Sequence, residues 1–216
     1  MPPDGRLVRG DATRRVVLRR AVDIASVEGL DGLSIGRLAT ELELSKSGVF
    51  AHFGSKESLQ LASIQAASEI FTEQVVTPAL AAPPGLARLW KLCETWLEYS
   101  ERRIFPGGCF FFNTAAEFDA RSGPVHDAIA EYTRKWQDLL TRLVAEAAQL
   151  GHLASGVEAA QLAFEIDALA RTANAHSVLH GGNEPYRRAR RGILGRLRAE
   201  AVEPDLLPPA GKERRG

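Results

Sequence analysis

The sequence lacks the features that mark secreted and membrane-spanning proteins. It has only two cysteines, Cys93 and Cys109, which form no CxxC pair and are too few for a disulfide framework. No run reaches the roughly 18 apolar residues that a membrane span needs, and Met1–Asp11 contains no apolar stretch like that of a secretory signal. We therefore expect a reduced, cytoplasmic protein without membrane contact, in which the simplest role of each cysteine is a small buried hydrophobic residue.

The sequence also lacks net charge, since 27 basic residues balance 27 acidic ones among 216. This balance argues against nucleic-acid binding by overall charge, so we expect any such binding to come from a local patch. Catalytic and metal-binding signatures are missing too: the histidines form no HExxH motif, and Cys109 has no histidine near it in sequence. We expect neither an enzyme nor a bound metal or cofactor.

The spacing of apolar residues predicts an all-α protein of about nine helices, because no strand-like alternation and no internal repeat occurs. Helical periodicity, caps and glycine stops place these helices at about 13–28, 35–42, 45–53, 55–76, 86–97, 115–118, 125–150, 155–180 and from 185 onward. Three prolines between Pro78 and Pro84 are expected to end the fourth helix, and Phe105–Asn113 to form a loop. Ser155 and Glu158 have the spacing of a capping box.

The stretch ELSKSGVFAHFGSKESL, residues 43–59, contains a helix that is too short and too polar to serve only for burial. Isolated helices this short are unstable in water, so this helix and the one before it need support from their longer neighbours. Ala39 permits a close crossing of the two short helices, and Leu44 and Val49 can fill the corner between them. This arrangement is a helix-turn-helix, whose second helix enters the major groove of DNA.

Polar residues around the second short helix suit a phosphate backbone. Exposed N–H groups at Ser45, Lys46 and Ser47 favour phosphate, and short side chains let the helix approach closely. Lys56 lies in the first turn of the next helix, where the dipole disfavours a cation, so we interpret it as a phosphate contact. The alternative is an ordinary polar helix with solvated lysines.

The stretch AVDIASVEGLDGLSIGRLATELELSKSGVFAHFGSKESL resembles the TetR family of bacterial transcriptional regulators, over about Val16–Leu61. The resemblance implies an all-α homodimer with an N-terminal DNA-binding head and a C-terminal ligand-binding body. It implies that two heads bind a pseudo-palindromic double-stranded operator, and that Ser34, Lys46, His52 and Lys56 touch DNA, mostly at phosphate. It also implies that the start of the second short helix, Ser45–Ser47, reads base edges or lies beside them. The predicted DNA-contacting residues are Ser34, Ser45, Lys46, Ser47, Gly48, Ala51, His52 and Lys56.

Two residues depart from the family pattern. Glu43 stands where glycine is usual in the turn, so we expect a less comfortable backbone angle or a different turn. Phe50 stands where tyrosine is usual and lacks the hydroxyl that would meet a phosphate, so we expect it to be a packing residue. His52 is equally compatible with phosphate donation and with packing.

Two clusters of arginine have competing interpretations. Met1–Arg20 holds six Arg against two Asp, which suits an arm that follows phosphates or enters the minor groove, but also suits a solvated, disordered tail. The cluster Arg187, Arg188, Arg190 and Arg191 lies far along the chain, and we assign it to a solvated helix face.

These patterns predict a helix-turn-helix DNA-binding domain at 1–60 with its basic arm at 1–12, a ligand-binding and dimerisation domain at 61–203, and a disordered tail at 204–216. The body segment GGCFFFNTAAEFDARSGPVHDAI resembles a recurring subgroup of TetR-family bodies. A small apolar or amphipathic effector suits aromatic walls with a few polar groups. The candidate ligand-binding residues are Trp90, Cys93, Trp96, Cys109, Phe110, Phe112, Asn113, Glu117, Trp136 and Phe164, each of which could instead be core.

Small residues at helical spacing near the C-terminus predict the homodimer interface. The candidate interface residues are Ala160, Ala163, Asp167, Ala170, Arg171, Asn174, Val178 and Leu197. The sequence thus predicts a homodimeric repressor that an effector releases from its operator. The alternative is an interaction or ligand-binding protein with the TetR fold that has lost specific DNA binding.

Overall fold

The computed structural model describes residues 5–209, and the side chains of residues 10–209. The expected all-α class is confirmed, with no strand among the described residues. The α-helices are α1 (Gly5–Glu28), α2 (Ile35–Glu41), α3 (Lys46–Phe53), α4 (Lys56–Phe71), α5 (Thr77–Leu80), α6 (Leu86–Glu101), α7 (Phe110–Phe118), α8 (Pro124–Gln149), α9 (Ala159–His180) and α10 (Glu184–Glu200). The 3-10 helices are η1 (Leu30–Gly32) and η3 (Pro204–Leu206), and η2 (Thr72–Val76) is a π-helix. None of the described helices has both the length and the apolar character that crossing a bilayer requires.

The described chain divides into two compact units. The first unit combines Met1–Ile70 with Arg103–Thr133, and the second combines Phe71–Arg102 with Arg134–Gly216. The polypeptide therefore passes between the units three times: after α4, after α6 and within α8. The compact units do not follow a single cut in the sequence, and the functional boundary at residue 60 stays a prediction.

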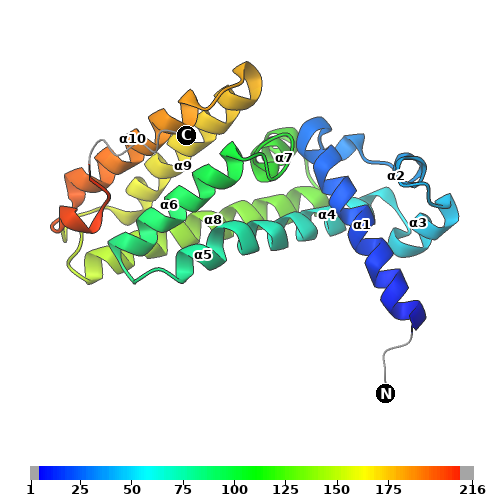
Figure 1. Cartoon of the computed structure of the whole chain (residues 1–216), viewed down its shortest axis with the longest axis horizontal. Coiled ribbons are helices and arrows are strands. Elements are labelled where there is room, and N and C mark those ends of the chain that lie inside the picture. The colour runs from blue at the N-terminus through cyan, green and yellow to red at the C-terminus, as the bar shows by residue number, and fades with distance from the viewer. Residues whose placement is uncertain (1–4, 210–216) are drawn as a thin grey trace. The chain divides into compact units, whose positions relative to one another are not determined.

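The core of the first unit forms where α1 packs against α2, α3 and α7 (Figure 1). Apolar residues three and four apart on α1 give it one buried face, because such residues share a side of a helix. The buried apolar residues of α1, η1, α2, α3 and α4 include Val17, Ala21, Val22, Ala25, Leu30, Leu38, Ala39, Val49, Phe53 and Leu59. The two short helices α2 and α3 are thus supported by a longer one, as the sequence predicts.

The second unit is built around α6, α9 and α10, which pack on one another. Figure 1 shows α9 and α10 side by side. A buried polar network links the three helices: Ser100 Oγ donates to Asn174 Oδ1 at 2.7 Å and lies 2.7 Å from the Tyr186 hydroxyl. Satisfied hydrogen bonds of this kind allow polar groups to remain in a core.

The predicted helix boundaries differ from the observed ones at both prolines and caps. Pro78 does not end the helical path, because α4 continues through η2 into α5, and Pro78 lies in the first turn of α5. Helix α7 begins at Phe110, so the predicted loop Phe105–Asn113 is shorter. Helix α9 is capped by Glu158 rather than Ser155: its carboxylate accepts from the Ala160 and Gln161 amides at 3.2 and 2.5 Å.

The two ends of the described chain also differ from expectation. Helix α1 begins at Gly5, so most of the basic arm is helical, and residues 1–4 lie outside the described residues. Residues Pro204–Leu206 form η3, Leu207 is buried, and Arg198 donates to the Pro208 carbonyl. The predicted disorder is thus wrong for residues 204–209, and residues 210–216 lie outside the description.

Candidate nucleic-acid interface

Helix α3 begins and ends with the residues that its sequence predicts. Ser45 is the N-cap, and its Oγ accepts from the Gly48 amide at 3.1 Å. A Cβ added at Gly48 would lie 2.8 Å from that Oγ, so glycine leaves room for the cap. Gly54 ends the helix with a φ of +71°, a backbone angle that glycine adopts without strain.

The two faces of α3 differ sharply in exposure. Val49 and Phe53 are buried against the rest of the first unit, at 1% and 6% exposure. The exposed residues of the helix are Lys46, Ser47, Gly48, Phe50 and Ala51, and His52 is half-buried. Except for Lys46 and Phe50 these exposed side chains are small, so the helix offers a narrow outer face that a major groove could admit.

The turn between α2 and α3 confirms the expected effect of Glu43. Glu43 has a φ of +55°, in the left-handed region that glycine occupies more easily. The Leu44 amide donates to the Ala39 carbonyl at 2.9 Å, which closes the turn around the buried methyl of Ala39. The backbone at Glu43 is therefore strained, and such strain in a non-glycine residue costs on the order of 1 kcal/mol.

Phe50 is not the packing residue that the sequence suggested. Its side chain is 54% exposed, although the next aromatic residue of the helix, Phe53, is buried. Position 50 lies one residue after the buried Val49 and on the outer flank of α3. The prediction was wrong because a missing hydroxyl does not by itself turn an aromatic side chain inward.

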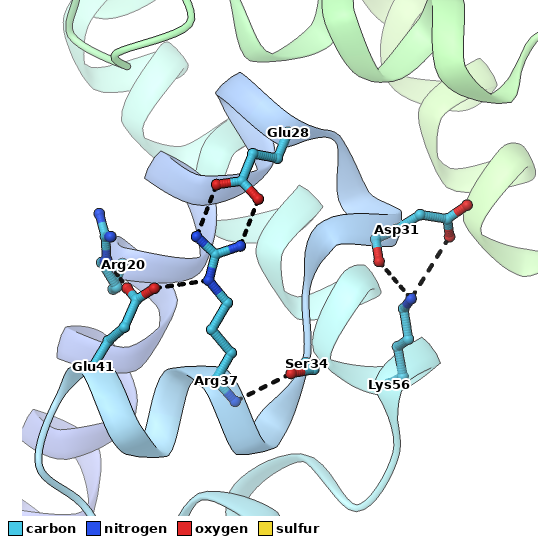
Figure 2. Close-up of polar contacts among 7 residues, drawn as sticks. All are labelled: Arg20, Glu28, Asp31, Ser34, Arg37, Glu41 and Lys56. Atoms are coloured by element: carbon cyan, nitrogen blue, oxygen red, sulfur yellow. Dashed lines mark hydrogen bonds and ion pairs between the residues drawn. The ribbon is translucent and has the colours of Figure 1, made fainter.

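A cap and an ion-pair network fix α2 against α1 (Figure 2). Ser34 Oγ accepts from the Arg37 amide at 3.1 Å, as its predicted capping role requires. The Arg37 guanidinium bonds both oxygens of Glu28 at 2.5 and 2.8 Å and reaches Glu41 at 2.7 Å. Arg20 bonds the other oxygen of Glu41 at 2.6 Å. Arg37 holds the pKa of both carboxyl groups below the usual range.

Sequence reasoning missed this network. The spacing of Arg37 and Glu41, four residues apart on one helix, is a local signal that could have identified one of its pairs. The bidentate pair with Glu28 joins two helices and has no such signal. Because these groups are exposed, the network orients α2 more than it stabilises the fold.

Lys56 lies beside η1 instead of pointing only to solvent. Its Nζ donates to the Asp31 carbonyl at 2.6 Å and lies 3.9 Å from Asp31 Oδ1 (Figure 2). The Lys56 side chain is still 49% exposed, so the ammonium keeps access to water. An ammonium has three donors, so one bond to a carbonyl leaves others for a phosphate. The predicted phosphate contact remains a prediction.

The polar candidates of α7 bind the protein's own backbone. The Glu117 carboxylate accepts from the Leu30 and Asp31 amides at 2.7 and 2.9 Å. The Asn113 amide donates to the Ser26 carbonyl at 2.6 Å and to the Gly107 carbonyl at 3.0 Å. Both side chains lie in the first unit. Their predicted role toward an effector therefore stays untested and competes with a contact to α1 and η1.

The remaining ligand candidates are divided between the two units. In the first unit Cys109 and Phe110 are buried and Phe112 is half-buried; in the second, Trp90, Cys93, Trp96 and Trp136 are buried. Trp96 and Trp136 meet edge to face with centroids 4.7 Å apart, and burial raises the pKa of Cys93 to about 12. Phe164, on α9, is 63% exposed. Whether any of them touches an effector stays a prediction.

The candidate interface residues on α9 and α10 fall on two different faces. Ala163, Asp167, Ala170, Asn174 and Leu197 are buried inside the second unit, while Ala160 and Val178 are exposed and Arg171 is half-buried. Asp167 accepts from Trp136 Nε1 at 3.0 Å and from Arg171 at 2.5 Å, which explains how a carboxylate remains buried there. The buried residues pack within their own chain, and their predicted place in a homodimer interface stays a prediction.

Among the side chains of residues 10–209, no three histidine, cysteine, aspartate or glutamate residues converge in a way that could hold an ion.

Two family models match the chain. One, described as bacterial regulatory proteins of the tetR family, matches residues 17–62, and the other, described as a tetracyclin repressor-like C-terminal domain, matches residues 85–193. No curated protein matches the sequence.

Solved structures of transcriptional regulators share the fold at low sequence identity. A TetR regulator from Chloroflexus aurantiacus is 24% identical, with a TM-score of 0.82 over 89% of this chain and 98% of that one. A TetR-family regulator from Cytophaga hutchinsonii is 19% identical, with a TM-score of 0.75 over 90% and 97%. AibR, solved with isovaleryl coenzyme A and operator DNA, is 18% identical, with a TM-score of 0.66 over 87% and 97%.

Proposed function

Since this chain belongs to the TetR family of bacterial regulatory proteins and has the fold of a DNA-binding transcriptional regulator, we propose that it is a homodimeric repressor released from its operator by a small effector. The observation that carries the proposal is the outer face of α3, which is exposed, narrow and capped by Ser45. Two such helices on a two-fold axis would enter successive major grooves of a pseudo-palindromic duplex.

Contacts to phosphate and contacts to bases divide among different residues in this proposal. Ser34 lies at the start of α2, where a helix N-terminus attracts phosphate, and Lys46, exposed in the first turn of α3, would lie beside base edges. Ser47 and Ala51 lie on the outer face of α3 and would approach base edges. Lys56 adds a positive charge on the flank, at the start of α4.

The dimer of this proposal uses the exposed face of α9 rather than its buried one. Phe164 and Leu179 are 63% and 76% exposed, which is unusual for large apolar side chains. Ala168, Thr172 and Ala175 are exposed between them at spacings of four, four, three and four residues, which is one stripe of a helix. A second copy of α9 would cover this stripe, as in a bundle between subunits.

The effector of this proposal is a small apolar or amphipathic molecule bound by the body. AibR, which has the same fold, holds an acyl thioester as well as operator DNA. The buried aromatic residues Trp90, Trp96 and Trp136 of the second unit supply apolar surface of the required kind. Release from the operator needs the effector to favour the released state by a few kcal/mol over the DNA-bound state.

A footprint on the intergenic duplex beside the protein's own gene tests the proposal. A protected pseudo-palindrome that binds one dimer, and loses protection when an acyl thioester or an apolar metabolite is added, would support it. Absence of any protected site in that duplex and in a selected pool of random duplexes would contradict specific DNA binding.

A second candidate function is an interaction or ligand-binding protein that keeps the fold and has lost specific DNA binding. Glu43 favours it, because this exposed carboxylate lies in the turn before α3 and carries the charge that phosphate repels. Phe50 favours it as well, because it offers no hydroxyl to a phosphate. The same footprint distinguishes the two candidates.

A further inference from the structure

The turn η1, which joins α1 to α2, is bound on its N–H side by α7. The first amides of a helical turn have no partner within that turn. Both oxygens of Glu117 accept from these amides, Oε2 from Leu30 at 2.7 Å and Oε1 from Asp31 at 2.9 Å. Hydrogen bonds to an ionised acceptor are among the stronger ones in proteins. Glu117 lies 86 residues after Asp31, so this contact is tertiary and not local.

The same turn is bound on its carbonyl side by α4. Lys56 Nζ donates to the Asp31 carbonyl at 2.6 Å, and Gln60 Nε2 donates to the Leu30 carbonyl at 3.0 Å. Arg121, three residues after the end of α7, pairs with the Asp31 carboxylate at 2.5 Å and lowers the pKa of that carboxyl group. Thus η1 lies between the α7 segment and α4, with charged side chains on both sides.

The end of α1 is bound by the loop that precedes α7. The Gly107 amide donates to Ser26 Oγ at 3.1 Å, and Asn113 Nδ2 donates to the Ser26 carbonyl at 2.6 Å. A Cβ added at Gly107 would lie 1.8 Å from that carbonyl oxygen, so only glycine permits this approach. Arg19 of α1 also donates to the Ile104 carbonyl at 2.8 Å. The segment 104–117 therefore runs along the last three turns of α1 and along η1.

We infer that Glu117 is a positioning residue that couples α7 to the DNA-reading helices, and that residues 103–133 complete the DNA-binding head. The inference rests on the proposed function and adds its route of regulation. Only Leu33 separates η1 from Ser34, the N-cap of α2, so a shift of α7 that carries η1 also carries α2 and α3. Apparent DNA affinity falls in proportion to the fraction of molecules whose head is held in the competent geometry.

Glu117→Gln tests the inference, with Asp119→Asn as its matched control. Both variants remove one negative charge near the end of α7, but Asp119 is exposed whereas Glu117 binds η1. In the full-length protein we expect amide hydrogen exchange at Leu30 and Asp31 to accelerate about tenfold in E117Q. Exchange in α2 and α3 is expected to accelerate too, while that in α9 and α10 stays unchanged. In D119N all of these rates should match the wild type.

Affinity for the duplex beside the protein's own gene gives a second readout. We expect it to fall roughly fivefold or more in E117Q, a typical size for coupling between sites, and to stay unchanged in D119N. Should E117Q fail to fold, Glu117→Asp keeps the charge with a shorter reach and is expected to give intermediate exchange rates.

The two proposals can fail separately. Unchanged exchange in α2 and α3 of E117Q and E117D would overturn the coupling, whatever the DNA measurements give. If the wild-type protein binds no duplex specifically, but exchange in α2 and α3 is still faster in E117Q than in the wild type, the proposed function is overturned and the coupling of α7 to η1 stands.

Discussion

Gly29 and Glu117 share a space that holds only one side chain. A Cβ added at Gly29 would lie 2.6 Å from Oε2 and 2.7 Å from Cδ of Glu117. Gly29 also has a φ of +80°, which L side chains rarely adopt. The carboxylate can reach the Leu30 and Asp31 amides because residue 29 has no side chain.

Gly29→Ala is therefore expected to destabilise the protein through two separable terms. Gly151→Ala is the matched control, since Gly151 has a φ of +76° and an added Cβ there meets nothing within 4 Å. We expect about 1 kcal/mol for the backbone angle in both variants and about 1–3 kcal/mol more for Gly29→Ala, measured by urea unfolding. Adding Glu117→Ala should remove most of the penalty of the clash. Strictly additive effects of the two substitutions would contradict the shared space.

The ion pairs of Arg37 predict an acid-dependent loss of stability. The pKa values of Glu28 and Glu41 are lowered in the folded protein, chiefly by the Arg37 guanidinium. Their contribution is thus fully present above the unfolded glutamate pKa of about 4.3 and is lost as pH falls through the lower folded values. We expect unfolding free energy to decrease less between pH 6 and about 3 in Arg37→Gln than in the wild type. An identical pH profile in both proteins would show that the exposed pairs contribute nothing.

Glu43→Gly is expected to stabilise the protein and to strengthen DNA binding. Glycine adopts the observed φ of +55° without strain, which is worth about 1 kcal/mol. The substitution also removes a carboxylate beside α3, whereas Glu43→Gln removes only the charge. The midpoint temperature of thermal unfolding should rise in E43G alone, and affinity for a duplex should rise in both variants. Equal thermal stability of E43G and E43Q would contradict the strain.

Lys46 and Lys56 are expected to act differently on DNA. Lys46→Ala should weaken binding to the operator more than binding to unrelated duplexes, because Lys46 is the first residue on the exposed face of α3. Lys56→Ala should weaken binding to all duplexes alike and reduce the slope of log affinity against log salt by about one. Lys135→Ala, which removes the same charge from an exposed position on α8, serves as the control. Titrations in which neither substitution differs from this control would refute both contacts.

Leu179→Glu is expected to give a monomer. Leu179 is the most exposed large apolar residue of α9, and a carboxylate there would lie inside the proposed interface. Val202→Glu provides the control, because Val202 is 62% exposed but lies outside α9 and α10. Light scattering during size exclusion should show a dimer for wild type and V202E, and a monomer for L179E. A monomeric wild type at micromolar concentration would end the dimer proposal.

Local features of the site could be predicted from the sequence. The caps Ser34 and Ser45 and the strained turn at Glu43 depend only on residues within a few positions of one another. The helix-turn-helix follows from the same short stretch, because the length and polarity of α3 leave few other arrangements.

Tertiary choices could not be predicted in this way. Nothing near Asn113 or Glu117 in sequence reveals that their partners are peptide groups near the end of α1 and in η1. On α9, alanines occur on the buried and the exposed faces alike, so their spacing did not tell which face packs inward. Phe164 resembled a core residue by its type, yet its side chain faces out.

The discontinuous first unit has a consequence for engineering. A chimera that joins a foreign reading module to this body at residue 60 or 70 would bring together an α1 end and a segment 103–133 that did not evolve for each other. The Ser26, Gly107 and Asn113 contacts would then be mismatched. A transplant that moves the N-terminal module together with the segment equivalent to residues 103–133 preserves both halves of that contact. Only such a transplant should bind the DNA target of the protein that donated the module.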